Sequence, residues 1–347
     1  MKYILYAFLI SFFFTISCIS KINEPSGYKR KGRWEKLITT GDIPSKRDAH
    51  SLVYDSRHHR MILFGGFYPV KVMSDIYSLD LNTLEWKKIS EGSLARAYHS
   101  AVYDSIMNRM IVFGGEDTVM KPSNQTWEFS FDTKQWLEIP TTGDIPLIRS
   151  GNASLFDPGG NRLIIFGGNN KDGVNNETCI LNLSTGEWKR QSVTGEIPSA
   201  RTYMGYSLID NFNKLIIFGG ESSYYEFFRD IYSLDIESGI WSKLETFSQA
   251  PPGRSGCAFQ FFPYLNSFVI FGGFSTIGSL NDTYLYEIDN KKWVRVYTKG
   301  EIPDRRIPFS SIYNPVKKSM IIFGGWNGSI PPDDIFYNDV YELTITN

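Results

Sequence analysis

The sequence has few of the residues that most often carry catalysis or bind metal ions. Its 347 residues include three cysteines and four histidines, and neither a Cys-x-x-Cys spacing nor a Gly-x-Ser-x-Gly motif occurs. A metal centre or a serine triad would need such residues at defined spacings. His50 and His99 each precede a serine at one repeated position, which indicates packing residues. We therefore expect no catalytic residues, no metal ion and no other cofactor.

An excess of charge of one sign is also absent. The chain has 36 Lys and Arg against 37 Asp and Glu, a formal net charge of −1, and the two signs are mixed along its length. No basic stripe is present that would bind a phosphate backbone. A nucleic-acid partner is therefore not expected.

Long apolar runs are missing except near the N-terminus, where residues 4–16 are apolar apart from Ser11 and Thr15. A run of 13 residues is too short to span a bilayer and is typical of a signal-peptide core. It leads to Ser17 and Cys18. A small residue before a cysteine at this place resembles a bacterial lipoprotein signal, in which the cysteine is lipidated. Thr15 stands where that family usually has leucine, so a signal peptide that is simply cleaved and an uncleaved anchor remain alternatives.

We accordingly predict a signal peptide over residues 1–17 and a lipidated Cys18 that opens a flexible tether over 18–32. The predicted localisation follows from these two segments. We expect the protein to be exported and held to a membrane of the cell envelope by its lipid, on the periplasmic or the cell-surface side.

What the chain has in quantity is a repeat. An apolar run ending in Gly-Gly occurs six times, and the steps between copies are 49, 53, 52, 53 and 52 residues. A period near fifty over six copies indicates a repeat architecture. The glycines lack the Lys-Ser/Thr of a phosphate loop, so we interpret them as places where backbones pass closely. The pairs are Gly65-Gly66, Gly114-Gly115, Gly167-Gly168, Gly219-Gly220, Gly272-Gly273 and Gly324-Gly325.

Each copy has the same internal order. An arginine lies 18 residues before the first glycine, and a variable loop after the glycines leads to an acidic or amide residue with an aromatic residue two places on in most copies. A tryptophan follows nine residues later, so each copy carries four short runs that are typical of strands. The sixth copy lacks its tryptophan, and Trp34 matches it. A closed ring would let the N-terminal run complete the sixth unit and remove exposed sheet edges.

Through its glycine pairs, loop-following aromatics and tryptophans, the sequence resembles the kelch family of β-propellers over residues 34–345. The resemblance implies an all-β fold: a six-bladed kelch-type β-propeller over residues 33–347, with four-stranded antiparallel blades and the ring closed by an N-terminal strand around Trp34. Cys179 and Cys257 then fall in the third and fifth blades, too far apart for a disulfide, and are expected to be buried thiols.

The repeated arginines allow two interpretations. They precede the first strand of each unit, which in a propeller lies near the central axis on the face with the variable loops. A ring of arginines there would bind an anionic ligand through bidentate contacts, and the family resemblance implies such contacts with acidic peptides in some members. Alternatively, each arginine pairs with a neighbouring carboxylate or backbone carbonyl, which its recurrence favours. The candidate residues are Arg47, Arg96, Arg149, Arg201, Arg254 and Arg306.

Aromatic residues in the variable loops are the second set of candidates. Clustered aromatics in a polar loop are typical of contact surfaces, although they could also fold back over their own blades. The candidate binding residues are Phe67, Tyr68, Tyr224, Tyr225, Phe228, Phe274 and Trp326.

The predicted function is that of a monomeric binding or scaffold protein that recognises a protein or glycan ligand through the variable-loop face. The alternative is a periplasmic carbohydrate-active enzyme, because some six-bladed periplasmic kelch proteins that isomerise sialic acids resemble this chain. That chemistry would need a carboxylate beside an arginine at the channel mouth, for which Glu116 and Glu221, directly after their glycine pairs, are the candidates. A purely structural scaffold in the envelope is a third possibility.

Overall fold

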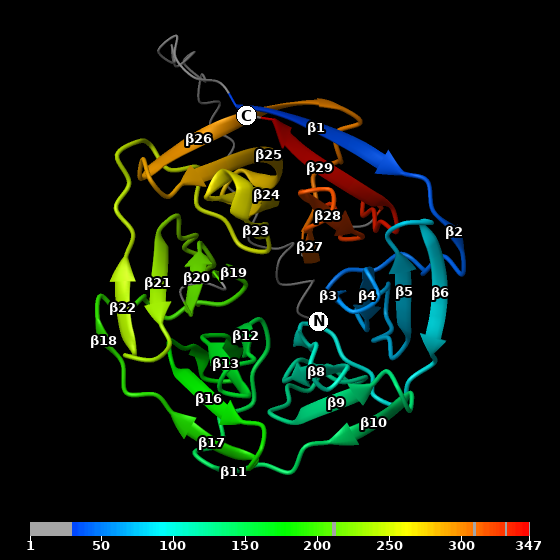
Figure 1. The fold of residues 1–347 in the computed structure, drawn as a ribbon. Coiled ribbons are helices and arrows are strands. Elements are labelled where there is room, and N and C mark those ends of the chain that lie inside the picture. Colours follow the sequence, from blue (N-terminus) through cyan, green and yellow to red (C-terminus); the bar gives the residue numbers. More distant parts are fainter. Residues whose placement is uncertain (1–29, 210–212, 308–309, 330–331, 347) are drawn as a thin grey trace.

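The computed structural model describes residues 30–209, 213–307, 310–329 and 332–346. They form six β-sheet blades arranged in a ring, as Figure 1 shows. The predicted all-β six-bladed propeller is therefore confirmed. The predicted signal peptide, Cys18 and most of the tether lie outside the described residues.

Each blade has four antiparallel strands, numbered here from the channel outward. Blades 1 to 3 consist of β3 (Ser51–Asp55), β4 (Arg60–Phe64), β5 (Ile76–Asp80) and β6 (Glu85–Ser90); β7 (Ser100–Asp104), β8 (Arg109–Phe113), β9 (Thr126–Ser130) and β10 (Gln135–Glu138); and β12 (Ala153–Asp157), β13 (Arg162–Phe166), β16 (Thr178–Asn182) and β17 (Glu187–Arg190). Blades 4 to 6 consist of β19 (Gly205–Ile209), β20 (Lys214–Phe218), β21 (Ile231–Asp235) and β22 (Ile240–Lys243); β23 (Ala258–Phe262), β24 (Ser267–Ser275), β25 (Gly278–Glu287) and β26 (Lys292–Gly300); and β27 (Ser310–Asn314), β28 (Ser319–Phe323), β29 (Val340–Thr346) and β1 (Arg30–Leu37).

The second strand of each blade is the most completely buried. In β4, the four residues from Met61 to Phe64 have no exposed surface, and β13 and β20 repeat the pattern. These strands read as continuous apolar runs because neighbouring blades cover both faces of each sheet. The apolar side chains of adjacent blades thus form one core layer per blade interface, for example between β4 and β8.

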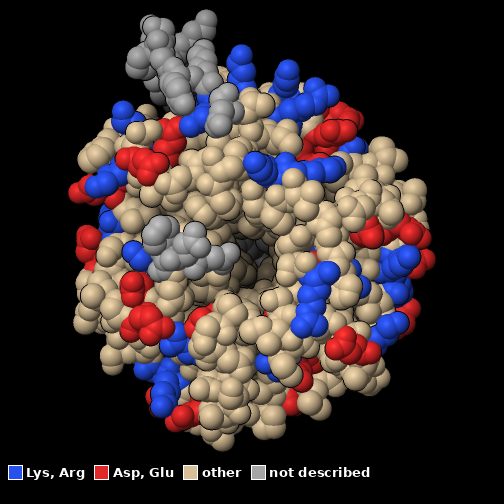
Figure 2. Space-filling model, viewed as in Figure 1, with Lys and Arg blue, Asp and Glu red and all other residues tan. Residues whose placement is uncertain are grey.

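A channel runs through the centre of the ring. The innermost strands line a cavity of about 650 Å³, and Figure 2 shows the hollow at the centre of the molecule. Among the described residues, no helix is long and apolar enough to cross a membrane. Cys179 and Cys257 are both buried and free, as expected, and burial raises the pKa of each thiol to about 11.

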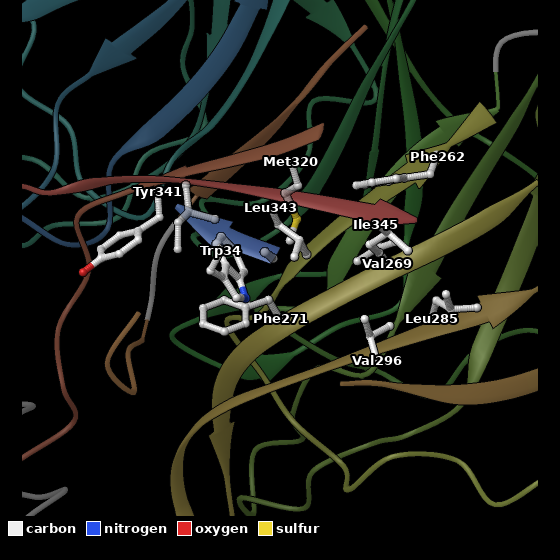
Figure 3. Packing of buried hydrophobic residues seen from close by; sticks show 12 residues of the cluster. Trp34, Phe262, Val269, Phe271, Leu285, Val296, Met320, Tyr341, Leu343 and Ile345 are labelled. Atoms are coloured by element: carbon white, nitrogen blue, oxygen red, sulfur yellow. The ribbon is translucent and has the colours of Figure 1, made fainter. Parts of the chain in front are cut away.

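The N-terminal strand closes the ring, which confirms the closure expected from Trp34. β1 pairs antiparallel with β29, with Trp34 opposite Leu343, and pairs parallel with β26 of blade 5. The Trp34 side chain has no exposed surface and lies 4.6 Å from the Phe271 ring, centroid to centroid. Figure 3 shows it within the cluster formed by blades 5 and 6.

The start of the ring differs from the prediction. β1 begins at Arg30, three residues before the expected boundary at residue 33, so residues 30–32 belong to the ring and not to the tether. The reason lies in blade 5: Arg30 Nη2 is 3.0 Å from Glu287 Oε1, and Arg30 pairs with Val296 of β26.

The links between blades also contribute strands that were not predicted. Short segments β2 (Thr40–Gly41), β11 (Thr142–Gly143) and β18 (Thr194–Gly195) pair in parallel with β6, β17 and β22. Blades 1, 3 and 4 therefore have a fifth, outermost strand, which Figure 1 shows at the rim of the ring.

Candidate functional site

The loops between the second and third strands form the candidate site. Because the strands of each blade are antiparallel, these loops and the links between blades lie on one face of the ring. We call them together the loop collar. It comprises residues 65–75, 114–125, 167–177, 219–230, 272–282 and the described part of 324–339.

The repeated arginines fasten the base of the loop collar. The Arg47 guanidinium donates from Nη1 to the Gly65 carbonyl at 3.0 Å and forms a bidentate pair with Asp75, at 2.5 and 3.1 Å. Asp75 is the acidic residue that ends the loop, so the arginine joins the two ends of it. Equivalent ion pairs are Arg149–Glu177, Arg201–Asp230, Arg254–Asp282 and Arg306–Asp339.

These arginines lie inside the blades, whereas the sequence led us to expect them near the central axis. Arg47, Arg149, Arg201, Arg254 and Arg306 have no exposed surface, and none of them lines the channel. The acidic residue within the same blade draws each guanidinium away from the centre. Of the two interpretations, the geometry supports pairing with neighbouring carboxylates and carbonyls, and the arginines are left out of the binding surface proposed below.

Blade 2 departs from this pattern. Arg96 Nη2 donates to the amide oxygen of Gln125 at 2.7 Å, where the other blades have a carboxylate. Burial lowers the pKa of Arg96, an effect that Asp117 and Glu138 oppose by their charge. Gln125 in turn donates from Nε2 to Glu138 Oε1 at 3.0 Å. The compensating negative charge in this blade therefore comes from Asp117 of the loop and Glu138 of the outer strand, and not from the residue that bonds the guanidinium.

The glycine pairs allow the close contact between blades that was inferred for them. Gly65 has φ +64°, and a Cβ on it would lie 2.3 Å from the Arg96 carbonyl oxygen of the next blade. The N–H of Gly66 donates to that same carbonyl at 2.8 Å. Since the second glycine of every pair bonds the arginine carbonyl of the following blade, the glycine–arginine contacts run around the whole ring.

Above this base, each loop is a small hairpin. Isolated bridges join Phe67 to Val72 and Glu116 to Pro122, β14 (Asn169–Asn170) pairs with β15 (Gly173–Val174), and further bridges close the loops of blades 4 and 6. In blade 5 the hairpin is continuous with β24 and β25. A hairpin lifts its tip away from the blade, so the tips are the outermost points of this face.

The predicted aromatic residues fall into packed groups and one exposed pair. Tyr68 contacts Phe336 edge-on at 5.1 Å, Trp326 stacks on Phe336 at 6.1 Å, and together they join the loops of blades 6 and 1. Phe274 meets Phe227 at 5.7 Å between blades 5 and 4.

The remaining aromatics are split between core and solvent. Phe67 is buried, and Phe228 lies over the Arg201 guanidinium at 4.2 Å. Tyr224 and Tyr225 are exposed. Packing of the loops on one another thus uses most of the predicted aromatics, and the structure brings only Tyr224 and Tyr225 to the tips.

Sequence analysis missed the aliphatic residues at the tips. Exposed apolar side chains lie at the hairpin tips of four blades: Val70 (87%), Val119 (77%), Tyr224 (92%) and Ile277 (75%). In blade 6 the exposed Ile335 lies beside the bridged residue Phe336. The tip of blade 3 carries Lys171 and Asp172 instead, both exposed. A single valine or isoleucine in a loop does not indicate a binding site. Its recurrence at the hairpin tip of several repeats does, and an alignment of the repeats with one another would reveal it.

The channel below the collar is uncharged. None of the described residues that line it is Asp, Glu, Lys or Arg. His50 and His99 are neutral there, because burial first and the nearby arginine second lower the pKa of each to about 3. Among the described residues, no group of three or more His, Cys, Asp or Glu is placed to hold a metal ion.

The two carboxylates named for the enzymatic alternative lie in the wall of the ring. Glu116 and Glu221 are buried, and each accepts a hydrogen bond from a serine of the next blade: Ser150 Oγ at 3.2 Å and Ser255 Oγ at 2.7 Å. The arginines of their own and neighbouring blades bond other partners. Sugar isomerisation on this chain stays a prediction.

Comparison with known proteins supports the fold and the repeat. A family model described as the KLHDC2/KLHL20/DRC7 kelch-repeats domain matches residues 29–159, 90–259 and 158–347. Kelch domain-containing protein 10 of Rattus norvegicus is 26% identical over 238 residues, which are 64% of this chain and 53% of that protein. Acyl-CoA-binding domain-containing protein 4 of Arabidopsis thaliana is 27% identical over 315 residues, 85% of this chain and 45% of that protein.

Among solved structures, the one described as "Structure of YjhT" superposes with a TM-score of 0.69 at 15% sequence identity. The match covers 88% of this chain and 99% of that one, and it shows a shared fold. The chain spans about half the length of the first curated relatives that it matches.

Proposed function

Because the chain belongs to the kelch-repeat family of β-propellers, we propose that it is a non-catalytic binding module that holds a partner protein on the tips of its loop collar. One observation carries this proposal: the hairpins of four blades each carry an exposed apolar side chain at the tip, all on the same face of the ring. These side chains are separate points on one face, so a partner that contacts several tips at once would bury them together.

The chemistry of the tips favours a protein over a glycan. Three of the four tip residues are aliphatic, and they are spread around the ring instead of forming one aromatic platform. Saccharide sites usually combine stacking aromatics with polar groups in a concave pocket, whereas protein interfaces bury apolar side chains over a broad area. Tyr224 and Tyr225 are the aromatic residues available as anchors, and tyrosine is frequent among energetically dominant interface residues.

A matched pair of positions tests the surface. Val70 lies on the collar and is 87% exposed, and Val316 lies on a turn of the opposite face and is 68% exposed. A photo-crosslinking amino acid at Val70 or Ile277 should trap a defined partner in the native host, and the same amino acid at Val316 should not. Tyr224→Ala should then weaken binding of that partner about tenfold, as expected for loss of an interface anchor.

The control and the contrary outcome are equally defined. Val70→Asp should abolish the cross-link formed from Ile277 without lowering the melting temperature, and Val316→Asp should leave it unchanged. Equal trapping from both faces, or a partner that survives Val70→Asp together with Tyr224→Ala, would rule out the collar as the binding surface.

We also propose that the module is exported and anchored through a lipid on Cys18. The apolar run 4–16 followed by Ser17-Cys18 supports this proposal. Each buried methylene of an acyl chain contributes about 0.8 kcal/mol to membrane affinity, so Cys18→Ser should move the protein from the membrane to the soluble fraction. Membrane association that persists in Cys18→Ser, with no lipid mass on the mature N-terminus, would exclude the anchor.

A further inference from the structure

Four blades share one device over their outermost long strand. A Gly-Asp/Glu-Ile-Pro link runs along that strand and pairs with it in parallel; we call this link the clasp. The clasps are residues 40–44 on blade 1, 142–146 on blade 3, 194–198 on blade 4 and 299–303 on blade 6.

The clasp of blade 1 shows how the device works. The N–H of Asp42 donates to the Trp86 carbonyl at 2.9 Å, and the Asp42 carboxylate accepts the N–H of Lys88 at 3.1 Å. Gly41 has φ +80°, and a Cβ on it would lie 2.2 Å from the Trp86 oxygen, so this position needs glycine. The other clasps repeat both bonds, with Asp144, Glu196 and Glu301 on Trp188, Trp241 and Trp34.

Charge matches across each clasp. The residue two places after the tryptophan gives its N–H to the acid of the clasp, and it is basic in all four blades: Lys88, Arg190, Lys243 and Lys36. The carboxylate of the clasp thus meets the main-chain N–H of a basic residue, while the side chains of Lys88 and Arg190 pair with Glu91 and Glu177. Cross-strand pairs of opposite charge stabilise a sheet, and like charges destabilise it.

Blade 5 covers its outer strand differently. Ser248 Oγ accepts the N–H of Trp293 at 2.7 Å and donates to its carbonyl at 3.0 Å, and β1 pairs with the second half of β26. The edge of this blade is therefore occupied.

Blade 2 is the exception. Its sheet ends at β10, and no described residue pairs with the outer side of that strand. The link before this blade, residues 91–95, has no Gly-Asp-Ile-Pro sequence and stays with blade 1, where Ser74 Oγ donates to the Glu91 carbonyl at 2.7 Å. Trp136 is consequently less buried than the five equivalent tryptophans, and Leu137 is 62% exposed. Figure 1 shows β10 at the outer rim of its blade.

The charge of this open edge is inverted. The residue two places after Trp136 is Glu138, where the clasped blades have lysine or arginine. Gln125 Nε2 occupies Glu138 Oε1, while no described residue bonds Oε2. An acidic clasp would place two negative charges close together at this edge. None of the links of this chain carries a basic residue at the clasp position, so none of them would avoid that repulsion.

We propose that the outer edge of β10 receives an extended segment of a partner protein as a fifth, parallel strand, with glycine facing Trp136 and a lysine or arginine directly after it, opposite Glu138. Addition of a strand to an open edge supplies main-chain hydrogen bonds, and the side chains at alternate positions supply specificity. The site lies on the rim of the ring, away from the hairpin tips, and it meets the loop collar only at its base, where Gln125 bonds Glu138.

Peptide probes test the proposal on the intact ring. A fluorescent peptide with Thr-Gly-Lys-Ile-Pro at its centre should bind at least tenfold more tightly than the same peptide with aspartate in place of lysine. Replacing its glycine by alanine should abolish binding, since the added Cβ meets the Trp136 carbonyl as it would in the clasps. Hydrogen exchange should show new protection at residues 135–138.

Glu138→Lys should reverse the preference, so that the aspartate peptide binds more tightly than the lysine peptide. If that variant does not fold, Glu138→Gln should reduce the tenfold preference to near equality while keeping the requirement for glycine. Asp172→Lys, on an exposed tip of blade 3, and Val70→Asp, on the collar, should leave peptide binding unchanged. No binding at millimolar peptide, equal affinity of the two peptides for the unmodified protein, or protection away from β10 would overturn the proposal.

Discussion

Replacing Arg47 with methionine separates the two roles considered for the repeated arginines. The Arg47 guanidinium has no exposed surface and makes five hydrogen bonds: two to Asp75, one to the Gly65 carbonyl, and two to the Ser45 carbonyl and hydroxyl. Methionine fills a similar length without charge or donors. Lys46 is the matched control, because it is the preceding residue of the same link and is exposed.

The magnitude follows from what the substitution leaves behind. Removing one partner of a buried ion pair costs about 3–5 kcal/mol. The Asp75 side chain is 18% exposed and can regain some hydration, which favours the lower end of this range. The Gly65 carbonyl loses its buried donor, which lowers the free energy of unfolding by about 1 kcal/mol more. We therefore expect a loss of about 3–4 kcal/mol. With an unfolding entropy of about 2.1 cal/mol/K per residue over roughly 300 residues, the melting temperature should fall by about 5 °C.

The assay is thermal unfolding followed by circular dichroism, with all variants at one scan rate because large domains often unfold irreversibly. Lys46→Met should melt within about 1 °C of the unmodified protein, as expected for an exposed side chain. Below its melting temperature Arg47→Met should still bind the collar partner. If Arg47→Met melts with the control but loses that partner, the arginine contributes to a binding site and the structural interpretation is refuted.

Two further predictions concern closure and pH. Trp34→Ala should lower the free energy of unfolding, measured in urea, by about 3–5 kcal/mol, because Trp34 is fully buried between blades 5 and 6. A chain that starts at Ile43 should lose more stability. A truncated chain as stable as the full ring would contradict closure through β1. Burial and the charge of Arg96 lower the pKa of His99 to about 3 from an ordinary 6.5. Neutral His99 therefore contributes fully to the free energy of unfolding above pH 6.5, and this contribution is lost by about 1.4 kcal/mol per pH unit as the pH falls towards 3. His99→Gln should reduce the slope of unfolding free energy against pH between 4 and 6 by about that amount, and an unchanged slope would mean that His99 is not held neutral.

Short-range pattern in the sequence was enough for the blades and for closure. The apolar runs before each Gly-Gly pair are typical of strands covered on both faces, and the tryptophan missing from the sixth copy has its counterpart in Trp34. Regular spacing supports such inferences, because repeated units that pack against one another in a ring place equivalent residues in equivalent environments.

The exposure of the loop side chains could not be predicted in the same way, because it depends on whether each side chain packs against a neighbouring loop or faces the solvent. Tyr68, Phe274 and Trp326 look like exposed candidates in the sequence, yet contacts between neighbouring hairpins use them for packing. The tips that reach solvent carry Val70 and Ile277, which composition does not distinguish from core residues.

The sequence by itself determined the number of blades, the closing strand and the repeated positions, since these follow from period and burial pattern. Only the tertiary structure decided where the arginines point and which outer strand is left open. Five of the six guanidinium groups pair with a carboxylate that lies 28–33 residues further along the chain. The clasps of blades 1, 3 and 4 bond residues 46 or 47 positions away, and that of blade 6 bonds a residue 265 positions away. Such pairings depend on how the ring folds back on itself, and no local spacing encodes them.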